Sequence, residues 1–157
     1  MQTFSDKLLA DLCARAAAAP RARAHHNIHA GNDDPVQRFL VAVQRNSYFR
    51  PHRHPVRSEL AVTLRGGFDV LSFDDNGTVT GRWSTGAGSG AFAYETPAAT
   101  WHTLLARDDG SVFLEVKQGP YDPATAVAFA PWAPPEGDPA VAQYQQWLRA
   151  ARVGERY

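Results

Sequence analysis

RPHRHPVRSELAVTLRGG, residues 50–67, is the stretch that decides the fold. His52 and His54 are two residues apart, Glu59 follows five positions later, and Gly66 lies seven beyond that. In a β-strand, residues i and i+2 face the same side of the sheet, so the two imidazoles project together. A tight turn after the short connection PVRS would bring the carboxylate of Glu59 beside them. The spacing therefore predicts a metal site laid out along two strands.

The sequence on both sides of this stretch is rich in strand signals. The period of two already holds at Phe39, Val41 and Val43. Further short β-rich runs follow, separated by segments with Pro, Gly or Asp: ELAVTL, FDVLSF, TVTGRW, AFAYE, HTLLA and SVFLEVK. The segment DDNG at residues 74–77 is a hairpin turn signal between two of them. Many short strands with almost no helix between them predict an all-β antiparallel barrel or sandwich.

The remaining segments are expected to attach to this barrel within a single domain of residues 1–157. Phe4, Leu8, Leu12 and Ala16 recur at helical spacing and predict a helix over 4–18. Residues 21–35 are polar and are expected to form a loop or an extended arm, and residues 36–117 the barrel. The proline-rich residues 118–157 predict an ordered tail that ends in a helix over 139–152. The expected apolar anchors of this tail are Tyr121, Phe129 and Trp132.

Composition excludes several classes of protein. The chain of 157 residues carries 16 Lys and Arg against 16 Asp and Glu, which is not the one-signed charge of a nucleic-acid or membrane-surface protein. A single cysteine, Cys13, rules out an internal disulfide framework and suits a reducing compartment. No apolar run approaches the roughly 20 residues that span a bilayer. We therefore expect a cytoplasmic protein that binds a small molecule.

A third imidazole is available from His102, at the start of the HTLLA run. Three neutral imidazoles and one carboxylate suit a divalent first-row ion and leave open positions for water or substrate. A lone His-x-His pair on a strand is more often a pair of surface residues than of ligands. Glu59, Gly66 and His102 together favour a metal site, although spacing does not choose among Fe, Mn, Ni and Zn.

The spacing HxHx4Ex6G resembles the first signature motif of the cupins, and PAATWH at residues 97–102 resembles the second. The chain is also similar to the WbuC family of cupin-fold metalloproteins over about residues 21–136. The segments that carry this similarity are RARAHHNIH, DDPVQRFLVAVQ, YFRPHRHP, FDDNG, TWHTLLA, FLEVKQGPYDP and FAPWAP. Four positions depart from the patterns: Asn46, Ser58, Ala99 and Ala106. None of the four is a ligand position.

This resemblance implies a cupin jelly roll, a barrel of two packed antiparallel sheets. It implies metal ligands at His52, His54, Glu59 and His102, and a setting in surface-polysaccharide metabolism. We expect a divalent ion to act on a small anionic or sugar-derived substrate in an isomerase, epimerase or lyase type of reaction. An iron-dependent dioxygenase and a non-enzymatic, metal-dependent binding module remain alternatives, so the sequence leaves open whether the protein is an enzyme.

Several residues around the ligands are candidates for substrate contact or catalysis. Arg50 shares the strand parity of His52 and should point inward, where it either grips an anionic group or pairs with a carboxylate such as Glu115. Asn27 and His29, in a second histidine group with His25 and His26, either fold over the barrel mouth or form a solvated arm or subunit contact. Arg50, Glu115 and His29 are therefore the catalytic candidates. We also expect a homodimer formed through sheet edges.

Overall fold

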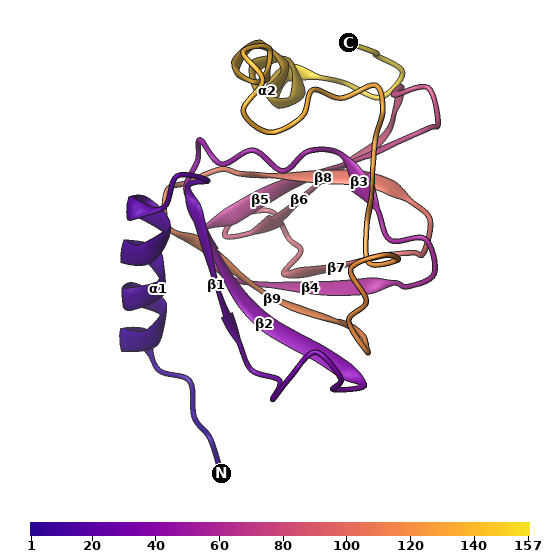
Figure 1. Cartoon of the computed structure of the whole chain (residues 1–157). Helices are drawn as coiled ribbons and strands as arrows, with labels where there is room; N and C mark the ends of the chain where they lie inside the picture. The colour runs from indigo at the N-terminus through magenta and orange to yellow at the C-terminus, as the bar shows by residue number, and fades with distance from the viewer.

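The computed structural model describes all 157 residues and contains two five-stranded antiparallel sheets that face each other (Figure 1). The first sheet has, in spatial order, β1 (Arg23–Asn27), β2 (Val36–Val43), β9 (Ser111–Gln118), β4 (Glu59–Arg65) and β7 (Ala93–Thr96). The second has β10 (Ala128–Phe129), β3 (His52–Arg53), β8 (Trp101–Ala106), β5 (Gly67–Phe73) and β6 (Val79–Gly86). The predicted all-β jelly roll is confirmed.

The space between the sheets is apolar at one end and polar at the other. Apolar side chains of both sheets form a core of Val41, Val43, Ala61, Phe68, Val70, Leu104, Ala106 and Phe113. Strand alternation then determines the polar end. His102 precedes Leu104 by two residues on β8, and Glu59 precedes Ala61 by two on β4, so both also point inward. Burial of the apolar end thus orients the candidate ligands.

The two helices cover the outer faces of the sheets (Figure 1). Helix α1 (Asp6–Ala18) buries Leu12 and Ala16 against β2 and β9. It begins two residues later than predicted because the hydroxyl of Ser5 caps it, accepting from the Leu8 amide at 3.4 Å. Helix α2 (Val141–Ala150) packs Tyr144 and Leu148 on the other sheet and is shorter than the predicted 139–152. Neither helix has the length and apolar character needed to cross a membrane.

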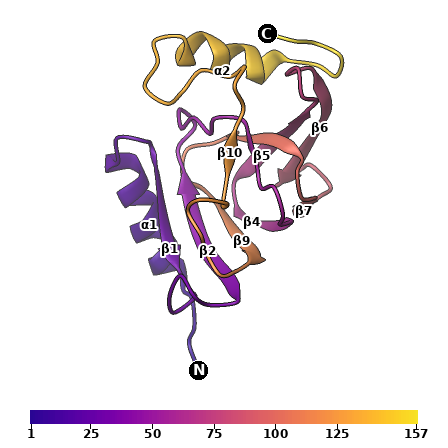
Figure 2. The same ribbon diagram turned by 45° about the vertical axis from the view of Figure 1, so that its right-hand side comes forward.

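The proline-rich tail runs from β9 to α2 and contains the short strand β10 (Figure 2). Its short strand β10 pairs with β3, so that Phe129 lies opposite His52. Of the three expected anchors, only Trp132 packs in the core, against Phe73 and Trp101. Tyr121 and Phe129 are 43% and 49% exposed, so the prediction that they are packed anchors was wrong. Backbone pairing with β3, rather than their burial, holds this part of the tail.

Candidate metal centre

Four side chains converge at the polar end of the barrel, two from β3 and the residue that follows it, one from β4 and one from β8. His52 on β3 and His102 on β8 are direct cross-strand partners, and His54 lies just beyond β3. The possible ligand atoms of these three histidines lie within 4.8 Å of one another. Glu59 begins β4 in the opposite sheet, and its two carboxylate oxygens lie 2.9 Å from His54 Nε2 and 3.0 Å from His102 Nε2. The structure thus brings together the four residues that the sequence singled out.

Backbone carbonyl groups orient all three imidazoles in the same way. Nδ1 of His52 lies 2.9 Å from the Arg50 carbonyl oxygen, and Nδ1 of His102 lies 2.9 Å from that of Thr100. Nδ1 of His54 lies 2.6 Å from the carbonyl oxygen of Ala126 in the tail. A carbonyl oxygen only accepts, so each Nδ1 carries the proton and donates. In a neutral imidazole this leaves the Nε2 lone pair free to bind a metal, as in many protein metal sites.

The contacts of Glu59 fit a cation at this place. With Nδ1 donating to a carbonyl, the Nε2 atom of a neutral His54 or His102 would face a carboxylate oxygen as a second acceptor. His54 Nε2 is buried and makes no aligned hydrogen bond despite its short distance from Glu59. Such an arrangement is stable only if the imidazole gains a proton or if a metal ion lies between the acceptors. The donor set, three imidazoles and a carboxylate, suits a divalent first-row ion.

Burial and charge set the protonation of this cluster. Burial, with a smaller effect of His102, lowers the pKa of His52 to about 3, so this ring is neutral and able to act as a ligand. Burial opposes the charged forms of Glu59 and His102, but their mutual hydrogen bond and charges outweigh it. The pKa of Glu59 is consequently well below its ordinary value, and that of His102 is raised. The metal-free cluster therefore holds a carboxylate that attracts positive charge.

A second carboxylate and a lysine lie next to this cluster on β9. Glu115 is buried, and its Oε1 lies 2.5 Å from Lys117 Nζ, which is itself 4.0 Å from Glu59. Burial and then the charge of Glu59 raise the pKa of Glu115, so part of its population is protonated nearer neutral pH than is usual for a glutamate. The expected alternative pairing of Arg50 with Glu115 is not made, because Lys117 takes that place.

Cations dominate the cavity at His52 and His54. This cavity of about 210 Å³ is lined by Arg21, Arg23, Arg50 and Lys117 against one carboxylate, Glu136. Arg50 donates to the Ala130 carbonyl at 2.7 Å and lies 5.4 Å from the centre of the Phe129 ring. Its Nε is buried without a hydrogen-bond partner. The cavity is therefore suited to an anionic group, and Arg50 keeps a donor free for it.

The second histidine group lies beside this cavity. Asn27 and His29 line an adjoining cavity of about 370 Å³, and Tyr121 lines both cavities. His29 is buried, and its Nδ1 lies 2.8 Å from the carbonyl oxygen and 3.0 Å from the amide nitrogen of Arg38. His25 is exposed on β1. Within the arm expected at residues 21–35, residues 23–27 are thus the edge strand β1, and Asn27 and His29 are next to the charged cavity rather than in it.

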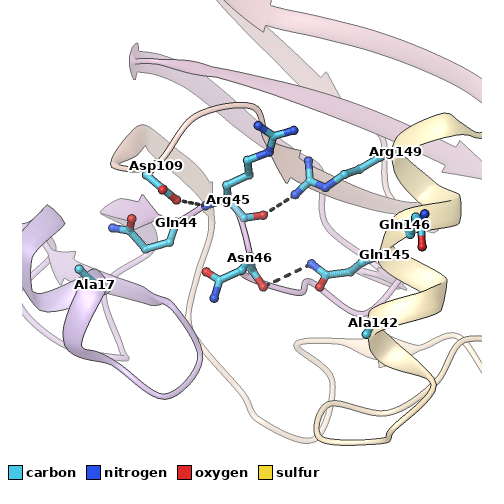
Figure 3. A pocket seen from close by; sticks show the side chains of 9 residues that line it. All are labelled: Ala17, Gln44, Arg45, Asn46, Asp109, Ala142, Gln145, Gln146 and Arg149. Atoms are coloured by element: carbon cyan, nitrogen blue, oxygen red, sulfur yellow. Dashed lines mark hydrogen bonds between the residues drawn. The ribbon is translucent and has the colours of Figure 1, made fainter.

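The largest cavity, of about 620 Å³, lies elsewhere, between α2 and the segment that follows β2 (Figure 3). Its polar side chains mainly attach the helix. Gln145 donates to the Asn46 carbonyl, and Arg149 donates to those of Arg45 and Ala106. The Asp109 carboxylate accepts from the Arg45 amide at 2.7 Å. No member of the histidine cluster lines this cavity, so its size does not make it the functional site.

Sequence reasoning did not single out Tyr94 or the Ala126 carbonyl. Tyr94 points inward from β7, opposite Ala61, and burial followed by the charges of Glu59 and Glu115 raises its pKa well above the ordinary value. Strand parity in AYET would have placed Tyr94 on the same face as Thr96. No sequence signal links Ala126 to His54, which is 72 positions away.

Two facing antiparallel sheets with an inward-facing histidine cluster have the architecture of the cupin fold, the double-stranded β-helix. A family model described as "Domain of unknown function (DUF6016)" matches residues 4–85, just over half of the chain, and the chain belongs to that family. No curated protein sequence matches the chain.

Solved structures share the fold at low sequence identity. A protein with a double-stranded β-helix domain from Klebsiella pneumoniae is 13% identical, with a TM-score of 0.56 over 83% of this chain and 97% of that one. Oxalate oxidase in complex with the substrate analogue glycolate is 16% identical, with a TM-score of 0.56 over 85% and 68%. DMSP lyase DddQ from Ruegeria pomeroyi is 20% identical, with a TM-score of 0.54 over 74% and 54%. These likenesses establish the fold and not the reaction.

Proposed function

We propose that this chain is a metal-dependent cupin that binds a small anionic or sugar-derived substrate at a divalent ion. The ion would be held by His52, His54, Glu59 and His102. The observation that carries the proposal is the common orientation of the three imidazoles, each with Nδ1 on a backbone carbonyl and Nε2 available to the centre. A solvated or purely structural histidine group would have no reason to share this orientation.

The residues around the ion would select and position the substrate. Bound at this site, a divalent ion supplies Lewis acidity toward a substrate oxygen. Arg50 would donate to an anionic group in the cation-lined cavity, and Lys117 would keep Glu115 oriented beside it. Isomerase, epimerase or lyase chemistry fits this arrangement because each needs a proton held near a polarised substrate. Glu115, with its raised pKa, is the side chain we propose for that proton.

The finer assignment, to a protein like those of the WbuC family in surface-polysaccharide metabolism, is also part of this proposal. It is supported by the sequence segments shared over about residues 21–136. A sugar acid would place its carboxylate in the cation-lined cavity, and it is a natural substrate in polysaccharide metabolism.

Metal content tests the proposal. Protein purified without a histidine tag should contain close to one divalent ion per chain by elemental analysis, which also identifies the ion. The substitution His54→Ala removes a ligand and should abolish most of this content. The matched control is His26→Ala, because His26 lies on β1 beside Phe4 and outside the cluster. Equal loss in both variants, or a wild-type protein that takes up no ion, would refute the site.

A further inference from the structure

A second cavity reaches the histidine cluster from the side of β6 and β7, the edge strands of the two sheets. It has a volume of about 410 Å³ and is more enclosed than the cation-lined cavity. Its wall consists of Val70, Ser72, Trp83, Tyr94, Glu95, Thr96, Pro97, Thr100 and His102. His102 belongs to this wall, whereas His52 and His54 line the other cavity. The candidate metal centre is therefore bordered by two cavities.

Trp83 forms a flat apolar surface in this second cavity. It lies opposite Val70 in the β5–β6 pair, which places it on the inward face, yet it is 55% exposed. Its indole lies directly over Gly81, where an added Cβ would clash with the ring. A single exposed aromatic residue is common on proteins. Here, however, one face of the indole lies on Gly81, and the indole also lines the cavity, so part of its apolar surface is left uncovered.

The two cavities differ in charge. No Lys or Arg lines the Trp83 cavity, whereas four of these cations line the other. Besides the His102 imidazole, its polar groups are the hydroxyls of Ser72, Thr96 and Thr100, the phenol of Tyr94 and one carboxylate, Glu95. Burial raises the pKa of Tyr94, so its phenol stays neutral and can both donate and accept. Such a wall suits a neutral group that carries hydroxyls and not an anion.

We infer that the Trp83 cavity binds the neutral, hydroxylated six-membered ring of the ligand, a pyranose, with one C–H face of the ring against the indole. A pyranose has apolar C–H faces and a polar rim of hydroxyls. The apolar face matches Trp83, and the rim matches the hydroxyls of Ser72, Thr96 and Thr100. The inference deepens the proposed function and rests on it, since the ring would reach the metal centre through the wall at His102.

Indole N–H signals in NMR spectra of the metal-loaded protein provide the test. The chain has four tryptophans, and the Trp83 signal is the one absent from Trp83→Ala. The probes are the methyl pyranosides of glucose, galactose, mannose and N-acetylglucosamine. At least one should shift the Trp83 signal, and Trp83→Ala should weaken its binding about tenfold or more. Gly81→Ala retains the indole but displaces it, and should weaken binding as well.

The matched control is Phe92→Ala, because Phe92 is 73% exposed and does not line the cavity. This variant should bind the pyranosides as the wild type does. The inference would be overturned if no pyranoside shifts the Trp83 signal, or if benzyl alcohol, an apolar ring, binds there more tightly than any of them. It would also be overturned if Trp83→Ala converts a dimer into a monomer on size-exclusion chromatography, since Trp83 would then be an interface residue. Metal content is measured on the same samples, so a failure of the metal site is recognised separately.

Discussion

Arg50 and Arg53 are three residues apart, and their side chains lie on opposite faces of the segment that carries His52. Arg50 lines the cation-rich cavity at His52, whereas Arg53 lies over the Trp101 ring on the outer face. We expect Arg50→Gln to weaken the binding of a sugar acid such as glucuronate by the metal-loaded protein about tenfold or more, because a charge-assisted hydrogen bond to the anion is lost. Isothermal titration calorimetry measures this change directly.

Arg53→Gln is the control for this experiment, since it removes the same charge from the same segment of chain on the other face. Its affinity for the sugar acid should stay within about twofold of the wild type, because the Arg53 guanidinium is paired with Asp75 and lies over Trp101, outside the cavity. A similar loss in both variants would mean that net charge, and not contact with Arg50, attracts the anion. Metal content should be unchanged in both.

At the level of single residues, the sequence predicted which side chains meet but not how they are held. The i, i+2 rule put His52 and His54 on one face, a tight turn after PVRS was expected to bring Glu59 beside them, and His102 came from the start of a later strand. It could not show that Lys117 rather than Arg50 would pair with Glu115, since both residues have inward parity. Partners across a barrel depend on the registers of several strands, which no short motif encodes.

Among the larger elements, the N-terminal arm and the tail are joined by ion pairs of Arg21 and Arg23 with Glu136. Its carboxylate accepts three hydrogen bonds of 2.6 Å, two from Arg21 and one from Arg23. Burial alone would raise the pKa of Glu136, but the hydrogen bonds from Arg21 and Arg23 prevail and lower it. We expect Glu136→Gln to lower the free energy of unfolding at pH 7 by on the order of 1 kcal/mol, given the exposure of the pair. For a chain of this length this is a fall in Tm of about 2–4 °C.

The pH dependence follows from the direction of this shift. Because the pKa of Glu136 is lower in the folded state, its ionised carboxylate stabilises the fold fully at pH values above its ordinary pKa of 4.5. This stabilisation is lost as the pH falls through the lower pKa of the folded state. The Tm difference between wild type and Glu136→Gln should therefore be largest near neutral pH and vanish in acid. Asp11→Asn is the control, because the exposed Lys7–Asp11 pair on α1 should contribute almost nothing. If the Tm difference between wild type and Glu136→Gln grew in acid, the ion pairs of Glu136 would not be its cause.

The apolar strands were predicted well, whereas β1 and β10 were not predicted as strands. ELAVTL, FDVLSF and SVFLEVK carry strong β patterns, and the structure contains β4, β5 and β9 there. Edge strands such as β1 leave polar side chains in solvent, so the RAHHN sequence has no apolar alternation. It is a strand because its backbone pairs with β2.

For the whole molecule, a metal ion should act as a link between the two sheets. His52 and His102 belong to one sheet and Glu59 to the other. An ion that binds only the folded chain stabilises it by about 2.7 kcal/mol at a free concentration 100 times its Kd. We therefore expect treatment with a chelator to lower Tm by about 5–10 °C in differential scanning calorimetry, with recovery on adding the ion back. His54→Ala should show no such response, and an equal response there would place the stabilising ion elsewhere.

The pairing of β10 with β3 has a consequence for shortened versions of this chain. A fragment ending at Gln118 would keep every proposed ligand and nine of the ten strands. It would nevertheless remove the acceptor for His54 Nδ1 and leave the two-residue β3 as an unprotected border of its sheet. We therefore expect deletion of the residues after Gln118 to lower metal content, as replacement of His54 should.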